Sequence, residues 1–67
     1  METLGTYLRA RREQLNLSQA AMARLIGTYQ PEISEWESDA KVPQFGTIKR
    51  IAKALDVQPA TIMKRLA

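Results

Sequence analysis

The side chains in this sequence that could do chemistry act through hydrogen bonds and charge, because the chain contains neither cysteine nor histidine. Thiolate and imidazole metal sites, disulfides and Ser/His or Cys/His nucleophile pairs are therefore excluded. A chain of 67 residues also has little length from which to form a substrate pocket. We expect no metal, no cofactor and no enzymatic activity, so binding functions rank above catalysis.

Two polar side chains near the middle of the chain have the chemistry to recognise the edge of a nucleic-acid base. The amide of Gln30 can donate and accept together, as a bidentate contact with adenine requires. The carboxylate of Glu35 can accept a hydrogen bond from the amino group of cytosine. Each side chain is also consistent with a plain role on a solvated helix surface.

The charge of the chain agrees with a polyanionic partner. Ten Lys and Arg residues against seven Asp and Glu residues give a net charge of +3 and a pI near 9.7. A basic surface that is merely solvated fits the charge equally well. Charge alone therefore leaves both interpretations open.

The elements that must position these side chains are helices. Apolar residues at helical spacing predict five of them, at residues 3–15, 19–26, 30–37, 44–55 and 59–66. Ser18 is a natural N-cap for the second helix, Gly27 suits the left-handed conformation that ends it, and Pro43 should open the fourth. Two helices joined by such a short turn form a helix-turn-helix. We expect an all-α fold, a compact five-helix bundle, as one domain over residues 1–67.

The apolar face of each predicted helix supplies the core. Its expected members are Leu4, Tyr7, Leu8, Leu15, Met22, Ala23, Ile26, Ile33, Trp36, Ile48, Ile51, Ala52, Leu55, Ile62 and Leu66. Trp36 follows Ile33 by three residues, so we expect it in the core rather than at a stacking site. The longest apolar runs are far shorter than the roughly 20 residues that span a bilayer, and the chain starts without a basic signal region. We expect no membrane association and a cytoplasmic, nucleoid-associated protein.

Several short motifs occur in a fixed order along the chain. They are Leu8-Arg9, Arg12-Glu13, Leu17-Ser18-Gln19, Gly27, Ile33-Ser34, Trp36-Glu37, Pro43 and Ile51-Ala52-Lys53-Ala54-Leu55. Each motif is weak alone, but their order and spacing together are specific and cover nearly the whole chain. On these residues the sequence resembles the Cro/repressor (XRE) family of helix-turn-helix domains, which has the lambda-repressor-like fold.

The resemblance implies that the third helix lies in the major groove of double-stranded DNA while the start of the second contacts the backbone. The residues implied to read bases are Gln30, Pro31, Ser34 and Glu35. The residues implied to contact phosphate are Ser18, Gln19, Tyr29, Lys41, Gln44 and Arg11. The helix dipole favours an anion beside Gln19. Arg12 and Glu37 are implied to pair and so tie the first helix to the end of the third.

The segment implied to enter the groove departs from the family pattern. Residues 28–39 contain no Lys or Arg and four acids, which are Glu32, Glu35, Glu37 and Asp39. We expect Glu35 and Asp39 to oppose binding, because like charges repel phosphate. Tyr29 stands where the family usually has a small hydroxyl N-cap, and Pro31 replaces a polar residue, so the polar readout surface is reduced.

Two functions remain open at this stage. The first is a sequence-specific transcriptional regulator, most simply a repressor, that binds a palindromic operator as a homodimer with recognition helices about 34 Å apart. The apolar edge available for pairing consists of Met63, Leu66 and Ala67. The alternative is a protein-interaction module, such as an antitoxin whose acidic third helix binds a basic toxin.

Overall fold

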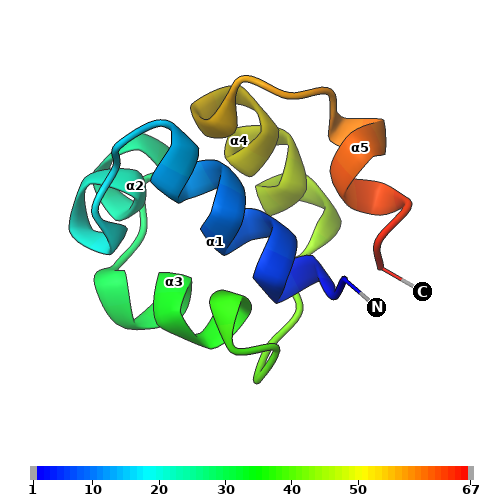
Figure 1. The fold of residues 1–67 in the computed structure, drawn as a ribbon, viewed down its shortest axis with the longest axis horizontal. Coiled ribbons are helices and arrows are strands. Elements are labelled where there is room, and N and C mark those ends of the chain that lie inside the picture. The colour runs from blue at the N-terminus through cyan, green and yellow to red at the C-terminus, as the bar shows by residue number, and fades with distance from the viewer. Residues whose placement is uncertain (1, 67) are drawn as a thin grey trace.

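Helices form in the predicted order and number in residues 2–66, the part of the chain that the computed structural model describes, and this part contains no strand. They are α1 (Leu4–Gln14), α2 (Gln19–Ile26), α3 (Gln30–Glu37), α4 (Phe45–Leu55) and α5 (Pro59–Met63). α2 and α5 lie at opposite ends with α1 and α4 between them, and α3 lies along the outside (Figure 1). The predicted all-α, five-helix architecture is confirmed.

The ends of three helices differ from the prediction. α1 is one residue shorter at each end, because Thr3 is its N-cap and accepts a hydrogen bond from an amide of the first turn. α4 begins at Phe45 because Gln44 is its extended N-cap, which leaves Pro43 outside the helix. α5 ends at Met63 instead of residue 66, with Lys64 as its C-cap. Apolar spacing could not fix these boundaries, because it does not record where the chain adopts the cap conformations.

Each helix contributes buried apolar side chains to one core. Its buried apolar members are Leu4, Leu8, Met22, Ala23, Ile26, Ile33, Trp36, Ile48, Ile51, Ala52, Leu55 and Ile62. Tyr7 and Leu15 are only partly buried and pack against this cluster. The prediction that Leu66 is a core residue is wrong, because the chain has left α5 before it and 36% of the residue is exposed.

Both ends of α2, and the turn that leads from it to α3, have the predicted geometry. The hydroxyl of Ser18 accepts from the amide of Ala21 at 3.0 Å and caps α2. Gly27 ends the helix with φ of 88°, a left-handed conformation that side chains rarely adopt, and its amide donates to the carbonyl of Ala23 at 2.8 Å. Tyr29, in an extended conformation, is the N-cap of α3.

α1 rests directly on the end of α3 at a glycine. A Cβ atom on Gly5 would lie 2.5 Å from the carbonyl oxygen of Glu37 and 2.6 Å from that of Trp36, far inside van der Waals contact. The Gly5 amide donates to Oδ1 of Asp39 at 2.9 Å, so a side chain from the loop after α3 caps the start of α1. Asp39 itself has φ of 63°. Local sequence does not indicate this role of Gly5, because the contact joins segments more than thirty positions apart.

A buried ion pair joins the same two helices. Nε of Arg12 lies 2.6 Å from Oε2 of Glu37 and Nη2 lies 3.1 Å from Oε1, a bidentate arrangement. The third donor, Nη1, reaches the carbonyl oxygen of Leu17 at 2.7 Å. The side chains of the pair are only 10% and 5% exposed. The hydrogen bond to Glu37 raises the pKa of Arg12, and the negative charges of Glu37 and Glu13 act in the same direction against burial.

Replacing Gly5 tests the close approach of α1 and α3. Gly5→Ala should destabilise the protein by about 1–3 kcal/mol, since the added methyl group meets backbone that cannot move aside cheaply. Gly46→Ala is the matched control, because no atom lies within 4 Å of its added Cβ. The control should stabilise α4 by about 0.5–1 kcal/mol. Urea unfolding measures both, and equal effects of the two changes would contradict the packing described.

Removing one partner of the buried ion pair should lower the stability of the fold far more than removing both. Arg12→Met leaves the Glu37 carboxylate buried without a cation, at an expected cost of about 3–5 kcal/mol in the free energy of unfolding. The double variant Arg12→Met, Glu37→Met should recover most of this loss, because no charge is then buried. A single-variant cost below about 1 kcal/mol, the value of an exposed pair, would show that the pair is solvated.

Candidate nucleic-acid interface

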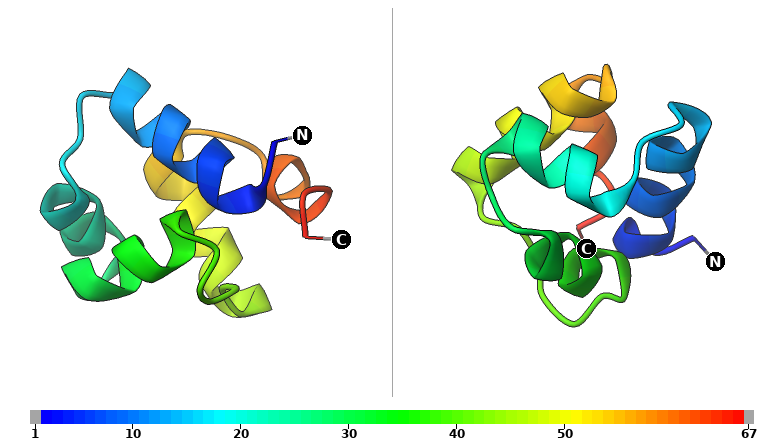
Figure 2. Two further views of the ribbon diagram at one scale, coloured as in Figure 1. Left: turned by 60° about the horizontal axis from the view of Figure 1, so that its bottom comes forward. Right: turned by 90° about the vertical axis from the view of Figure 1, so that its left-hand side faces the viewer.

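One side of α3 faces outward and carries the residues expected to read bases. Gln30, Pro31 and Ser34 are exposed and Glu35 is half-buried. The opposite side of the helix packs into the core through Ile33 and Trp36. Both views in Figure 2 place α3 at the edge of the molecule, with no other helix over its outer face. The structure therefore leaves the four predicted side chains available to a partner.

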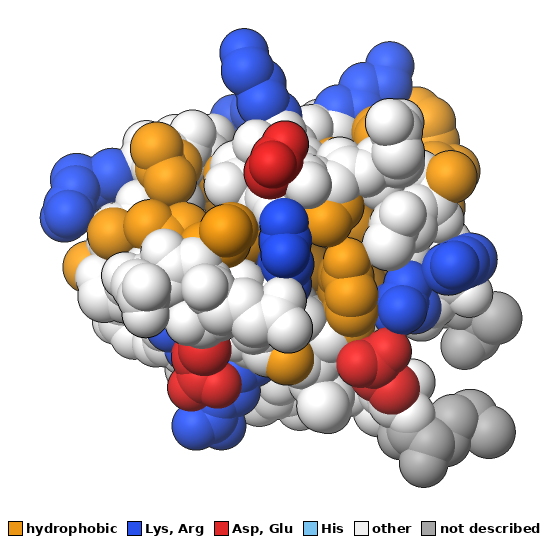
Figure 3. All heavy atoms as spheres, turned by 45° about the horizontal axis from the view of Figure 1, so that its top comes forward, with side chains coloured by type: hydrophobic (Ala, Val, Ile, Leu, Met, Phe, Trp, Pro, Cys, Tyr) orange, Lys and Arg blue, Asp and Glu red, His pale blue; other side chains and the backbone are white. Residues whose placement is uncertain are grey.

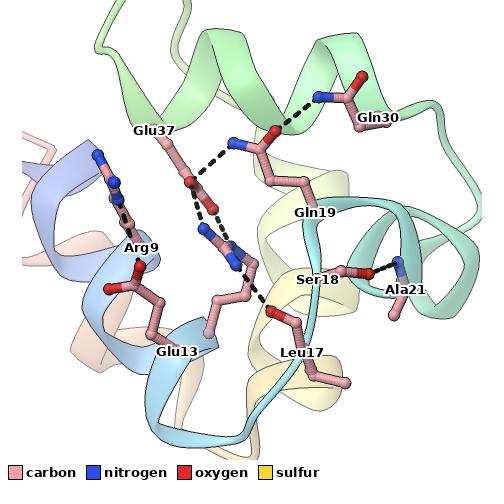
Figure 4. A network of polar contacts seen from close by, with 9 residues as sticks. Arg9, Glu13, Leu17, Ser18, Gln19, Ala21, Gln30 and Glu37 are labelled. Atoms are coloured by element: carbon pink, nitrogen blue, oxygen red, sulfur yellow. Dashed lines mark hydrogen bonds and ion pairs between the residues drawn. The ribbon is translucent and has the colours of Figure 1, made fainter.

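A chain of hydrogen bonds connects this face to the start of α2 and to the buried ion pair. Nε2 of Gln30 donates to Oε1 of Gln19 at 2.6 Å. Nε2 of Gln19 in turn donates to Oε1 of Glu37 at 3.0 Å. Figure 4 shows the two amides and the carboxylate one after another, from Gln30 through Gln19 to Glu37. The spacing of these residues along the chain does not indicate that they touch.

The residues expected to contact phosphate flank α3 at both of its ends. Ser18 and Gln19 lie at the first turn of α2, where the positive end of the helix dipole favours an anion. Tyr29 lies just before α3 and is 80% exposed. Lys41, in the loop after α3, and Gln44, the N-cap of α4, are both exposed.

Arg11 differs from the other phosphate candidates. Its Nε donates to the carbonyl oxygen of Leu55 at 2.9 Å, and Nη2 lies 3.4 Å from the carbonyl oxygen of Asp56. The guanidinium therefore neutralises the carbonyl end of α4, the usual place for a cation on a helix. The structure groups Arg11 with α4 rather than with the outer face of α3.

All four acids of residues 28–39 have a partner within the chain. Glu37 pairs with Arg12, and Glu32 accepts a hydrogen bond from the hydroxyl of Thr28. Lys41 Nζ lies 3.4 Å from Oε1 of Glu35, with both side chains partly exposed. The carboxylate of Asp39 is engaged by the Gly5 amide. The negative charge of this segment is thus partly compensated, which its composition alone does not reveal.

Most of the basic side chains lie away from α3. Viewed from the side of α4, the molecule carries Lys and Arg side chains around its edge, separated by apolar patches (Figure 3). Lys49 lies over the ring of Phe45 at 5.6 Å from its centroid, and Arg50 donates to the carbonyl oxygen of Ile26 at 3.2 Å.

Within residues 2–66, no three Asp, Glu, His or Cys residues are grouped as a metal site requires. No helix in that range has the length and apolar character needed to cross a membrane.

Comparison with known sequences agrees with this architecture. Residues 8–62 match the helix-turn-helix family. The chain is 32% identical over 63 residues to repressor protein C2 of Salmonella phage P22, covering 94% of this chain and 29% of that protein. It is 33% identical over 55 residues to antitoxin HigA1 of Mycobacterium tuberculosis, covering 82% of this chain and 37% of that protein. The chain therefore spans about a third of the length of these relatives.

Solved structures show the same fold. The P22 c2 repressor in complex with synthetic operator 9T superposes with a TM-score of 0.89 at 31% identity, covering 92% of this chain and 94% of that one. The restriction-modification controller protein C.AhdI from Aeromonas hydrophila has a TM-score of 0.83 at 29% identity, covering 88% and 86%. With its family match, its five helices and the geometry of its α2–α3 turn, the chain belongs to the helix-turn-helix family of the Cro/repressor (XRE) type.

Proposed function

We propose that this chain is a sequence-specific DNA-binding domain of a transcriptional regulator, most simply a repressor, which inserts α3 into the major groove. The observation that carries the proposal is the uncovered outer face of α3, with Gln30 and Ser34 exposed beside the start of α2. Support comes from the similar fold of the P22 c2 repressor in complex with a synthetic operator. DNA binding would place the protein at the nucleoid in the cytoplasm.

Base readout in this proposal combines three kinds of contact. The amide of Gln30 pairs with adenine, and Ser34 adds a hydroxyl that can donate or accept. Glu35 accepts from the amino group of cytosine when Lys41 turns from it to a phosphate. Pro31 offers only an apolar surface. Phosphate contacts from residues at both ends of α3 would set register without distinguishing sequences.

A homodimer on a palindromic operator would double the few contacts that one small domain can make. The apolar edge expected from the sequence includes Met63 and Leu66, which are 38% and 36% exposed, whereas Ala67 lies outside the described residues. Val42 is 66% exposed and lines a hollow of about 300 Å³ together with Leu66 and with charged residues that include Lys41 and Arg65. We propose that this edge, with Val42 added to it, is the surface through which two copies pair.

The competing function is binding of a basic protein partner, as in a toxin–antitoxin pair. Its support is the 33% identity to antitoxin HigA1. It would need free negative charge on α3, yet Glu37 and Glu35 pair with Arg12 and Lys41. The third acid of the helix, Glu32, accepts a hydrogen bond from Thr28. DNA binding is therefore the function that the geometry favours.

Selection from a randomised duplex pool, at low and at moderate salt, tests the DNA-binding proposal. We expect enrichment of a palindromic sequence and an affinity that falls steeply with salt, because bound phosphates release counterions. The retained duplexes are sequenced, and a pool carried without protein is the control. Failure to enrich any sequence at either salt concentration would reject DNA readout and favour the protein partner.

Two single variants separate base readout from phosphate contact. Gln30→Ala should cost about 1–3 kcal/mol on the selected site and relax the preference at one base-pair position. Lys41→Ala should weaken binding to all sequences alike and lower the salt slope by about one unit. Titrations of site variants at several salt concentrations provide both readouts. Indistinguishable behaviour of the two variants would refute the assigned roles.

A further inference from the structure

We infer that the groove between α2 and α4 is a second interaction surface, which binds an acidic amphipathic helix of a protein partner. The residues that line this groove are Leu25 of α2 and Arg50, Lys53 and Ala54 of α4. Its volume is about 430 Å³. None of the lining residues belongs to α3 or is a phosphate candidate, so the inference goes beyond the proposed DNA binding and does not depend on it.

The groove combines an exposed apolar side chain with room beside it. α2 packs against α4 and lies next to it in the right-hand view of Figure 2, with α3 below both. Met22 and Ile26 of α2 face the core, whereas Leu25 points away from it and is 60% exposed. A single exposed leucine is ordinary on a protein surface. Here, however, Leu25 and the small, half-buried Ala54 line one hollow, which can receive an apolar side chain of a partner.

The charge on these two helices is positive and uncompensated. α2 and α4 together contain no Asp or Glu and four cations, which are Arg24, Lys49, Arg50 and Lys53. None of the four takes part in an ion pair within residues 2–66. The three acids of α3, in contrast, are all engaged within the chain. Charge complementarity therefore selects a partner surface that carries Glu or Asp around its apolar residues.

Arg50 is already held where a carboxylate of the partner would meet it. Nη1 of Arg50 donates to the carbonyl oxygen of Ile26 at 3.2 Å, and Nη2 lies 3.5 Å from the hydroxyl oxygen of Thr47. These contacts fix the guanidinium across the end of α2 and use only two of its five N–H groups. A side chain that is ordered before binding loses less conformational entropy on binding. Arg50 can therefore hold one carboxylate, and Lys53, one turn further along α4, supplies a second cation.

The shape of the site favours a helix over an extended peptide. An extended segment is commonly bound by adding a strand to the edge of a sheet, and residues 2–66 contain no strand. A furrow between two packed helices instead accepts side chains that recur every third or fourth residue on one face of a third helix. Leucines at that spacing would enter the hollow beside Leu25, and glutamates that flank them would reach Arg50 and Lys53.

A designed acidic peptide is the probe for this surface. It has about 18 residues, enough to form a helix, with leucines along one face and glutamates beside them. Nuclear magnetic resonance titration of the full chain should show saturable shifts at the amides of the groove residues and little change in α3. Absence of such shifts up to about 1 mM peptide, or shifts confined to α3, would overturn the inference.

Two control peptides separate helix recognition from simple charge attraction. One is a scramble of the same composition, in which the leucines do not share a face, and the other has lysine in place of glutamate. Both should bind about tenfold more weakly than the acidic amphipathic peptide or not at all. Equal binding of the scramble would mean that the groove recognises charge alone, and the inference would then be wrong.

Matched variants locate the binding site. Leu25→Ala should weaken binding of the acidic peptide about five- to tenfold, because an apolar anchor is lost. Phe45→Ala is its control, since Phe45 is equally exposed, at 59%, but does not line the groove. Lys53→Gln should weaken binding about two- to fivefold, the value of an exposed ion pair, whereas Lys64→Gln, at an exposed position outside the groove, should not. All four side chains are exposed, so the variants should fold. Equal effects within either pair would contradict the inference.

Duplex DNA of random sequence is the competing ligand for the same cations. At low salt, we expect the peptide to stay bound in the groove when the duplex is added. A duplex that shifts the groove residues and displaces the peptide would identify Arg50 and Lys53 as phosphate contacts and overturn the inference. Failure of α3 to respond to any duplex would count against the proposed function alone, because the peptide titration judges the groove separately.

Discussion

The buried pair of Arg12 and Glu37 is the interaction on which the rest of this structure depends. It joins α1 to the last residue of α3 with two hydrogen bonds, and a third bond from Arg12 holds the chain just before α2. Burying two charges is costly, and such a pair holds its place only when its donors and acceptors are satisfied. Here Gln19 donates a further hydrogen bond to the carboxylate. This pair thereby links α1, α2 and α3, and it is connected through Gln19 to the exposed side chain of Gln30.

Close packing beside this pair makes the arrangement rigid. At Gly5 the backbone of α1 touches the backbone of α3, and Asp39 caps α1 from the loop that follows α3. The C-terminal end of α3 is therefore fixed by an ion pair, by a backbone contact and by the loop residue that caps α1. A rigid support of this kind lowers the entropy that a readout side chain must lose on binding. In the proposed function, the packing behind α3 would make the placement of Gln30 precise.

The acidic character of the α3 region has a structural explanation. Three of its four carboxylates serve the fold, since they pair with Arg12, accept from Thr28 or cap α1. The fourth, Glu35, pairs with Lys41 at the surface. The negative charge that argued against DNA binding is for the most part charge used to hold the helix in position. The basic residues elsewhere on the surface leave the chain with a net positive charge.

Short-range features of the sequence were sufficient to predict the helices, their order and the turn at Gly27. Apolar spacing, the Ser18 cap and a left-handed glycine each act over only a few residues. It also identified the exposed side chains of α3. Helix ends at Gln44 and Met63, and the loss of Leu66 from the core, depended on competing contacts that spacing does not record. Only the tertiary structure brought Gln19, Gln30 and Glu37 into one line and set Arg11 against α4. Those placements join residues far apart in the chain, and the direction of a hydrogen bond exists only once its partner is in place.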